Sequence, residues 1–188
     1  MYGIAPAMTA DLNPRGSQAL RESDARFNAS ATRADIGIAE QNRKAVIEIL
    51  NTVLADEFVL YVKSRRFHWN VEGQDFAELH DLFQKHYEQL AVIIDDVAER
   101  ARALDGRAAG SIEEYLNLTR LAEEPSKVYD ARGMIAALLD DHEALVRSLR
   151  ADLRVCGDEY CDEGTMDFLT GLMQTHEKTA WMLRAYLR

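Results

Sequence analysis

The sequence FHWNVEGQDFAELHDLFQKHYEQLAVIIDDVAER, residues 67–100, decides the fold of this chain. From its second turn onward the apolar residues recur at intervals of three and four, which is the pattern of a helix with one buried stripe. The stripe comprises Phe76, Leu79, Phe83, Leu90, Ile94, Val97, Ala101 and Leu104. Gly106 follows the last of these residues and is a typical helix terminator. The stretch therefore predicts a long amphipathic helix over residues 75–104.

The same stretch carries a mixture of imidazoles and carboxylates. Three of the five histidines of the chain lie in it, His68, His80 and His86, and acidic residues surround them. Such a mixture suits iron and similar metal ions. Asp95 and Glu99 are four residues apart, so they share one helix face with about 5 to 6 Å between their Cβ atoms. Two carboxylates in that arrangement can chelate one metal ion or bridge two.

The spacing excludes a site formed by one chain alone. His80 and Asp95 are fifteen residues apart on the same helix, and at about 1.5 Å per residue this places them over 20 Å apart. Di-iron sites inside a single bundle use Glu-x-x-His on two helices, and no histidine here has Glu three residues before it. If His80, Asp95 and Glu99 bind one site, a second subunit must complete it. Antiparallel pairing of this helix with its two-fold mate would do so.

These residues resemble the motif of the Dps-type miniferritins, the DNA-binding proteins from starved cells. The resemblance rests on His-Trp-Asn beginning at His68, on His80, and on Asp95-x-x-x-Glu99, and it extends over residues 38–188. It implies an all-α, ferritin-like four-helix bundle with a short extra helix in the long crossover, assembling into a hollow shell of twelve subunits. It also implies ferroxidase sites at two-fold interfaces, with His68 and His80 from one chain and Asp95 and Glu99 from its mate.

The function implied by the resemblance is iron sequestration. Such a protein oxidises Fe(II), preferably with hydrogen peroxide, at sites that hold two irons, and it stores the ferric mineral in its shell as protection against oxidative stress. Zinc can act there as an inhibitor or a substitute. Trp69 is either an interface aromatic or an electron donor that protects the site from radicals, and the two roles are compatible.

One position departs from the family pattern. The family commonly has a carboxylate four residues after the second histidine, and this chain has Gln84 there. A neutral amide is a poorer ligand than a carboxylate, which predicts weak binding of one iron or its assignment to water. His86 is an alternative ligand, although it is rotated by about 200° around the helix from Gln84.

A second acidic cluster lies between residues 156 and 167. In the resemblance, Asp158, Glu163 and Asp167 line a three-fold pore, where three copies would form a negative funnel that attracts Fe(II). A plain surface turn is the alternative. Cys156 and Cys161 are five residues apart, the wrong separation for a Cys-x-x-Cys metal or redox motif, and are predicted to be reduced thiols.

Length and composition agree with this interpretation. A chain of 188 residues, 47% of them hydrophobic, is suited to one domain with a substantial core. Only three prolines and ten glycines occur, which favours long helices over many short strands. The net charge of −10 argues against a protein whose main ligand is a polyanion, and it suits a container for cations.

Residues 1–37 are predicted to be a flexible or draped extension. They contain scattered Gly, Pro, Ser and Thr without periodic apolar spacing. Their arginines and acidic residues balance and lysine is absent, which argues against DNA binding by this arm. No signal peptide and no apolar run long enough for a membrane span is seen, so the predicted location is the cytoplasm, with association with the nucleoid as an option. The alternative function is a DNA-coating nucleoid shell with a degenerate or zinc-occupied metal site.

The periodic pattern predicts four long helices and one short helix that begins at a Ser-x-x-Glu capping box. These helices cover residues 38–67, 75–104, 111–118, 130–154 and 164–187.

Two further predictions concern polar residues within these helices. Asp140, Asp141, His142 and Glu143 are predicted to form a solvated face, with a second metal site as the alternative. His176 lies on the apolar stripe of its helix and is predicted to be a core histidine, hydrogen-bonded across the bundle. The ring of His80 is expected to be oriented by Asp81 or by a backbone carbonyl.

Overall fold

The structure, a computed structural model, describes residues 34–188, and from Ile36 onward these form one compact unit. The described part is all-helical and contains no β-strand, which confirms the predicted fold class. Its elements are α2 (Glu40–Asn70), α3 (Phe76–Ala103), α4 (Ile112–Leu118), α5 (Ala131–Arg154), the π-helical turn η1 (Val155–Glu159) and α6 (Glu163–Leu187). The prediction of an extension over residues 1–37 falls almost entirely outside the described residues. None of the helices within 34–188 is long and apolar enough to cross a membrane.

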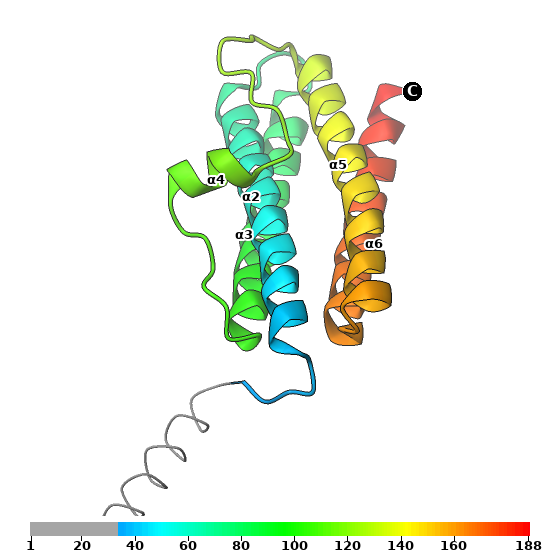
Figure 1. The fold of residues 1–188 in the computed structure, drawn as a ribbon. Helices are drawn as coiled ribbons and strands as arrows, with labels where there is room; N and C mark the ends of the chain where they lie inside the picture. The colour runs from blue at the N-terminus through cyan, green and yellow to red at the C-terminus, as the bar shows by residue number, and fades with distance from the viewer. Residues whose placement is uncertain (1–33) are drawn as a thin grey trace, which may run out of the picture. The chain divides into compact units, whose positions relative to one another are not determined.

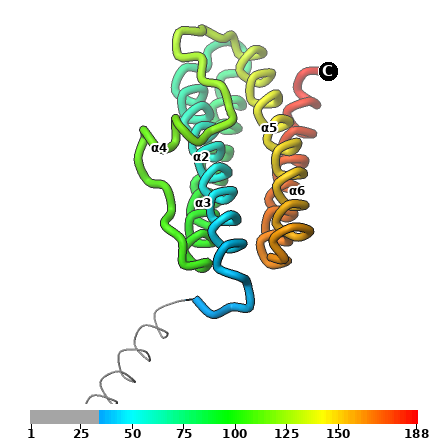
Figure 2. The backbone as a smooth tube through the Cα atoms, viewed as in Figure 1, coloured from blue at the N-terminus to red at the C-terminus, as the bar shows by residue number. Residues whose placement is uncertain are grey.

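The four long helices form two antiparallel pairs. α2 packs along α3, and α5 packs along α6 (Figure 1). The path of the backbone shows that α2 and α6 run in one direction and α3 and α5 in the other (Figure 2). Because α3 and α5 are parallel, the chain between them must return over the length of the bundle, and α4 lies in this crossover against α2. This is a four-helix bundle with one long crossover connection.

The core is formed by apolar side chains of all four long helices. Most of the stripe predicted for α3 is buried, but Phe76 is 48% exposed. Phe76 is the first residue of α3, at the end of the bundle, where its ring lies 5.1 Å from that of His80. The fully buried core residues include Leu50, Leu60, Phe83, Leu104, Leu138, Leu149 and Leu169.

Helix α2 is longer than predicted, and this changes the setting of His68. The helix continues to Asn70, whose side chain donates to the Arg66 carbonyl, and ends where Val71 becomes extended. No glycine or proline lies between Gly37 and Gly73, so nothing in the sequence stops the helix earlier. His68 therefore lies inside the last turn of α2, which fixes its backbone.

The turn between α5 and α6 was not predicted in its detail. The π-helical turn Val155–Glu159 extends α5, and Asp162 then caps α6 by accepting from the Thr165 amide at 2.8 Å. A side chain at Gly157 would meet the Met166 sulfur, because a Cβ built there lies 2.5 Å from it. Any larger residue at position 157 would therefore need the Met166 side chain to move.

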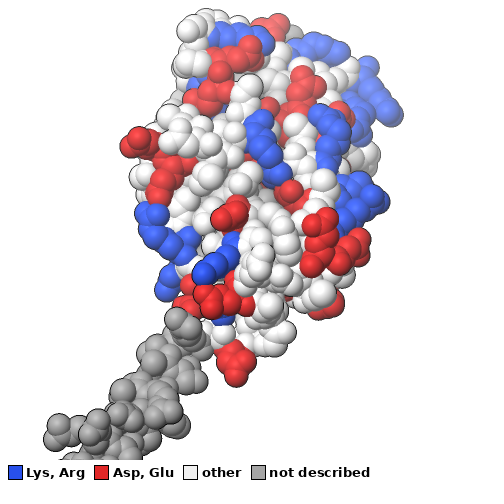
Figure 3. Space-filling view, in the orientation of Figure 1, with Lys and Arg blue, Asp and Glu red and all other residues white. Residues whose placement is uncertain are grey.

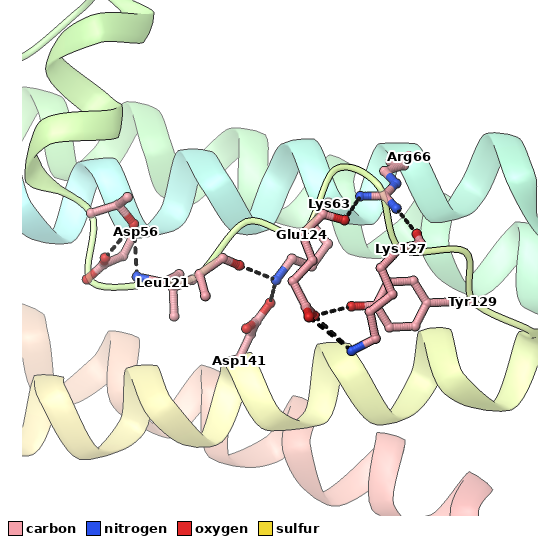
Figure 4. Close-up of polar contacts among 10 residues, drawn as sticks. Asp56, Lys63, Arg66, Leu121, Glu124, Lys127, Tyr129 and Asp141 are labelled. Atoms are coloured by element: carbon pink, nitrogen blue, oxygen red, sulfur yellow. Dashed lines mark hydrogen bonds and ion pairs between the residues drawn. The ribbon is translucent and has the colours of Figure 1, made fainter.

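The crossover is held to α2 by polar contacts as well as by packing. Asp56, which is buried in α2, accepts from the Arg120 amide at 2.6 Å, and the Arg120 guanidinium also bridges Asp56 to Asp152 of α5. Farther along α2, Arg66 donates to the carbonyls of Glu124 and Lys127 (Figure 4). Backbone groups of this long connection are satisfied in this way although the connection has little secondary structure.

The prediction of a solvated face on α5 is wrong for two of its four residues. Asp140 is exposed, but Asp141 forms an ion pair with Lys63 of α2 at 2.5 Å in which both side chains are largely buried (Figure 4). His142 is 1% exposed and points into the core. The charged run spans more than a full turn, so part of it has to face the bundle. Glu143, half-buried, pairs with Arg184 of α6.

Candidate metal centre

His68 at the end of α2 and His80 near the start of α3 hold each other through their backbones. The His68 Nδ1 atom lies 2.8 Å from the carbonyl oxygen of His80, and the His80 Nδ1 atom lies 2.9 Å from the carbonyl oxygen of His68. Their rings stack with centroids 3.7 Å apart. A carbonyl oxygen only accepts, so each Nδ1 carries a hydrogen, and in the neutral form of each ring Nε2 presents a lone pair. Both rings are thus set in the tautomer that binds a metal through Nε2.

The orienting group of His80 is therefore a backbone carbonyl, one of the two predicted partners. The other predicted partner, Asp81, does not orient the His80 ring. Its carboxylate forms an exposed ion pair with Lys85, one turn farther along α3. Sequence spacing alone does not reveal the reciprocal contact, because it depends on α2 continuing to Asn70.

A cationic and aromatic wall lies beside the two histidines. The Tyr87 ring is perpendicular to that of His68 at 5.3 Å, and the Arg65 guanidinium lies 4.8 Å from the Tyr87 ring centroid. Arg65 also lies 5.2 Å from the ring of Trp69, which is 65% exposed, and donates to the Tyr61 hydroxyl at 2.7 Å. That hydrogen bond raises the pKa of Arg65. This wall was not predicted from the sequence, although Tyr61, Arg65 and Trp69 recur at a four-residue interval.

Asp95 and Glu99 lie on α3, one turn apart and both exposed. Within residues 34–188 neither carboxylate forms a hydrogen bond or an ion pair, so both are free to bind a cation. Because α3 is a continuous helix, the fifteen residues between His80 and Asp95 separate them by about 22 Å. The structure therefore does not bring the histidines and these carboxylates together in one chain. In the described part of the chain no three His, Cys, Asp or Glu side chains surround a point ready for a metal ion.

The two alternative ligands lie in different surroundings. Gln84, one turn after His80, donates to the Glu88 carboxylate at 2.8 Å, so a carboxylate lies two turns beyond His80 on the same side of α3. His86 does not join the stacked pair. It is buried in the core, with its ring 5.0 Å from that of His142.

The three predicted pore residues lie at the η1 end of the bundle. Asp158 belongs to η1, Glu163 and Asp167 belong to the start of α6, and all three are exposed. The neighbouring Asp162 is instead buried and forms an ion pair with Arg100 at 3.0 Å. Since Arg100 follows Glu99 in α3, this ion pair joins the acidic turn to the helix that carries the candidate ligands.

The two cysteines of this turn differ in their exposure to solvent. Both are free thiols, with Cys156 buried and Cys161 exposed in a backbone conformation with φ of 53°. Burial, reinforced by the nearby Asp162 and Asp152 carboxylates, raises the pKa of Cys156 to about 12. Cys156 is therefore an inert thiol at neutral pH.

Comparison with known proteins places this geometry in a class. The Ferritin family, a ferritin-like domain, matches residues 47–188. The fold is similar to DpsC from Streptomyces coelicolor, with a TM-score of 0.79 and 30% identity over 84% of this chain and 91% of that one. It is also similar to the Dps protein of Vibrio cholerae O1, described as a member of a superfamily of ferritin-like diiron-carboxylate proteins. For the Vibrio cholerae protein the TM-score is 0.77 and the sequence identity is 32%. The match covers 83% of this chain and 97% of the other. The chain belongs to the ferritin-like family.

Similarity to individual proteins shows which branch of the ferritin-like family the chain belongs to. The chain is 48% identical over 155 residues to an uncharacterized low temperature-induced protein of Nostoc sp., covering 82% of this chain and 87% of the relative. It is 38% identical over 144 residues to the DNA protection during starvation protein 2 of Bacillus anthracis, covering 77% of this chain and 97% of the relative. Within the ferritin-like family the chain is a Dps-type miniferritin, as the His-Trp-Asn motif predicted.

Proposed function

We propose that this protein sequesters iron as a ferroxidase that oxidises Fe(II), preferably with hydrogen peroxide, and stores the ferric product inside a shell of identical subunits. The observation that carries the proposal is the reciprocal hydrogen bonding of His68 and His80. It fixes both imidazoles, when neutral, in the tautomer that binds a metal through Nε2. The similarity to ferritin-like and Dps proteins supports it.

The complete site needs a second subunit. One subunit would supply His68 and His80 and its mate would supply Asp95 and Glu99, since antiparallel pairing about a two-fold axis brings the opposite ends of two α3 helices together. The exposure of both carboxylates fits this arrangement, because an interface group is open in the isolated subunit. The shell of twelve subunits is part of the proposal and rests on family membership.

The chemistry of such a site couples two irons to one oxidant. Each of two Fe(II) ions, about 3.5 to 4 Å apart as in other two-metal sites, gives one electron to hydrogen peroxide. The peroxide O–O bond breaks, two protons are taken up and two waters form, while both irons become Fe(III). Because two electrons arrive together, no hydroxyl radical is released. Protection against oxidative stress follows from this pairing.

Two further groups would assist the reaction. Asp158, Glu163 and Asp167 would line the iron entry pore, where a concentration of negative charge raises the local Fe(II) concentration. Trp69 would donate an electron when only one iron is bound. Its position next to Arg65 and near the stacked histidines supports this role, and its exposure also suits an interface residue.

DNA coating is the second candidate function. It is favoured by the relative named a DNA protection during starvation protein. Against it stand the net charge of −10 and the interspersed acidic and basic side chains on the face that carries α4 and α5 (Figure 3). A gel shift with duplex DNA at low salt separates the two functions, because a shell that shifts no DNA at low salt has no coating role.

The proposal is tested by adding Fe(II) anaerobically to the sized assembly, then adding hydrogen peroxide and following ferric absorbance. Rapid oxidation by the native protein should be lost when His80→Ala and Glu99→Ala are combined. Asp81→Asn is the matched control, since Asp81 adjoins His80 but points to Lys85, and it should oxidise iron at the native rate. Equal slow traces for the native protein and the double variant would contradict the proposal.

A further inference from the structure

The core of the bundle contains a group of buried ionisable side chains, one from each long helix. They are Glu57 of α2, His86 of α3, His142 of α5 and His176 of α6, with exposed fractions of 0%, 7%, 1% and 1%. We call these four residues the core cluster. It is separate from the stacked histidines of the candidate metal centre and takes no part in the proposed ferroxidase reaction.

The core cluster connects the two antiparallel helix pairs. In α6, His176 Nε2 lies 2.8 Å from a carboxylate oxygen of Glu57 in α2. In α5, the ring of His142 has its centroid 5.0 Å from that of His86 in α3. Both contacts run from the α5–α6 pair to the α2–α3 pair, which are the two halves of the bundle (Figure 1). A change that weakens the core cluster therefore weakens the packing of one helix pair on the other.

One hydrogen bond in the core cluster depends on how many protons the cluster holds. His142 Nδ1 lies 2.8 Å from His176 Nδ1, so one of these nitrogens must donate and the other must accept. A charged imidazole has a hydrogen on both nitrogens and accepts at neither. If both rings were charged, two N–H groups would face each other across this short distance. The closed bundle therefore requires at least one of the two imidazoles to be neutral, whichever ring carries the shared hydrogen.

The groups that face this imidazole pair carry little compensating charge. Glu57 contacts the pair from α2, and the group that faces it from α3 is another imidazole, His86. The carboxylates next to the pair along α5 and α6 are each bound to a cation: Asp141 to Lys63, Glu143 to Arg184 and Glu177 to Arg150. Glu57 can balance one charged imidazole. A second would be an uncompensated buried charge, which is costly.

We propose that the core cluster is an acid-sensitive switch, which holds the α5–α6 pair against the α2–α3 pair at neutral pH and favours their separation at mildly acidic pH. Because His142 and His176 are each 1% exposed, a proton reaches the second ring only when the helices open. The closed state also has three buried atoms without a hydrogen-bond partner, Glu57 Oε2, His142 Nε2 and His86 Nδ1. Such unsatisfied groups destabilise the closed state, so less additional free energy is needed to open it.

The direction of the pH dependence follows from the neutral rings. Burial, together with the charge of His176 when it is protonated, lowers the pKa of His142 well below the usual 6.5 and that of His86 to about 4. Above pH 6.5 neither the open nor the closed state takes up protons at these rings. As the pH falls further, the open state binds protons that the closed state excludes, so the closed state loses stability. For His142 alone, the ratio of open to closed molecules should rise about 20-fold between about pH 6 and about pH 4.5.

Hydrogen–deuterium exchange of the assembled protein measures this ratio. Peptides of α5 and α6 are followed by mass spectrometry at about pH 6 and about pH 4.5, and the exchange rates are corrected for the intrinsic effect of pH. His142→Asn keeps a hydrogen-bonding amide close to the Nδ1 position but cannot become charged. On acidification the open fraction should rise about 20-fold more in the native protein than in His142→Asn. Asp140→Asn removes an exposed carboxylate from the same helix and is the matched control, which should behave as the native protein.

Circular dichroism and gel filtration at neutral pH establish that each variant is folded and assembled. If His142→Asn does not fold, hydrogen exchange at the ring C2–H of His142 in the native protein gives the pKa of that ring directly, and a value well below 6.5 is expected. A His142 pKa near 6.5 would overturn the proposal. So would an equal rise of the open fraction in the native protein and in His142→Asn. Neither measurement requires iron, so the result is independent of the proposed ferroxidase function.

Discussion

His68 and His80, twelve residues apart, each accept on their backbone carbonyl a hydrogen bond from the ring of the other, at 2.9 and 2.8 Å. The pair therefore joins the last turn of α2 to the beginning of α3 across the intervening turn. In the neutral rings it also leaves one lone pair on each, so the histidine side of the proposed site is organised before any metal arrives. Preorganisation of this kind lowers the cost of binding.

In the proposed site, the residue at position 84 is expected to control binding of the second iron. Gln84→Glu places a charged oxygen ligand one turn from His80, and we expect Fe(II) affinity at the weaker of the two positions to rise about tenfold, or about 1.4 kcal/mol. Anaerobic calorimetric titration with Fe(II) measures this change. Gln89→Glu adds the same charge at an exposed position of α3 and should change the affinity little. If both substitutions raise the Fe(II) affinity equally, the increase comes from net charge alone and not from a ligand at position 84.

The ion pair of Lys63 and Asp141 stabilises the docking of the crossover and α5 on α2. Lys63→Met leaves the Asp141 carboxylate largely buried without its partner, and we expect the free energy of unfolding to fall by about 3 kcal/mol. Lys63→Met combined with Asp141→Leu removes both charges and should recover most of this loss. Denaturant unfolding of the single and double variants measures the coupling. A double variant no more stable than Lys63→Met would show that the pair is not the source of the effect.

The two thiols should react differently with iodoacetamide. Only a thiolate reacts, and because the pKa of Cys156 is raised to about 12 by burial, Cys156 stays protonated as the pH rises from 7 to 9. Mass spectrometry of the native protein should therefore show one label per subunit, at the exposed Cys161, throughout this range. Unfolding before alkylation should give two. Labelling of Cys156 in the native protein at pH 8 would contradict its burial.

The acidic turn should set the rate of iron entry. Asp158→Asn with Asp167→Asn should slow Fe(II) uptake several-fold at low ionic strength, and the difference should shrink as salt screens the charges. Stopped-flow oxidation kinetics at two salt concentrations measure both effects. Asp140→Asn with Glu123→Gln makes the same charge change at exposed positions outside this turn and should have a smaller effect. Unchanged Fe(II) uptake in the first variant would show that this turn does not guide iron entry.

The elements that sequence predicts well are those with a local cause. The stripe of α3 is set by apolar spacing, and the short helix begins at Ser111 because Ser111 and Glu114 form the reciprocal capping box. The bonds that Glu114 accepts, first from the Gly110 amide, lower its pKa to about 2. Each of these features is determined within one or two turns of the chain, so a local pattern suffices.

The elements that sequence did not predict are determined by distant partners. Asp141 and His142 were expected to be solvated, and their burial depends on Lys63 and His176, which are 78 and 34 residues away along the chain. The prediction that His176 is a hydrogen-bonded core histidine was right, but its partners could not be named from spacing. The ligand set of His68, His80, Asp95 and Glu99 stays a prediction, because within one chain the histidines lie far from the two carboxylates.

The most direct test of the central claim, that each ferroxidase site is shared by two subunits, is complementation in mixed shells. One variant carries His68→Ala with His80→Ala and the other carries Asp95→Ala with Glu99→Ala, so each alone should be inactive. The two variants are dissociated, mixed in equal amounts and reassembled. Where one subunit of each variant meets at a two-fold interface, the intact histidines of one face the intact carboxylates of the other. If subunits mix at random, roughly a quarter of the sites should be complete. Peroxide-driven Fe(II) oxidation at about a quarter of the native rate is the predicted result. Mixed shells as inactive as the two parents would contradict the shared site.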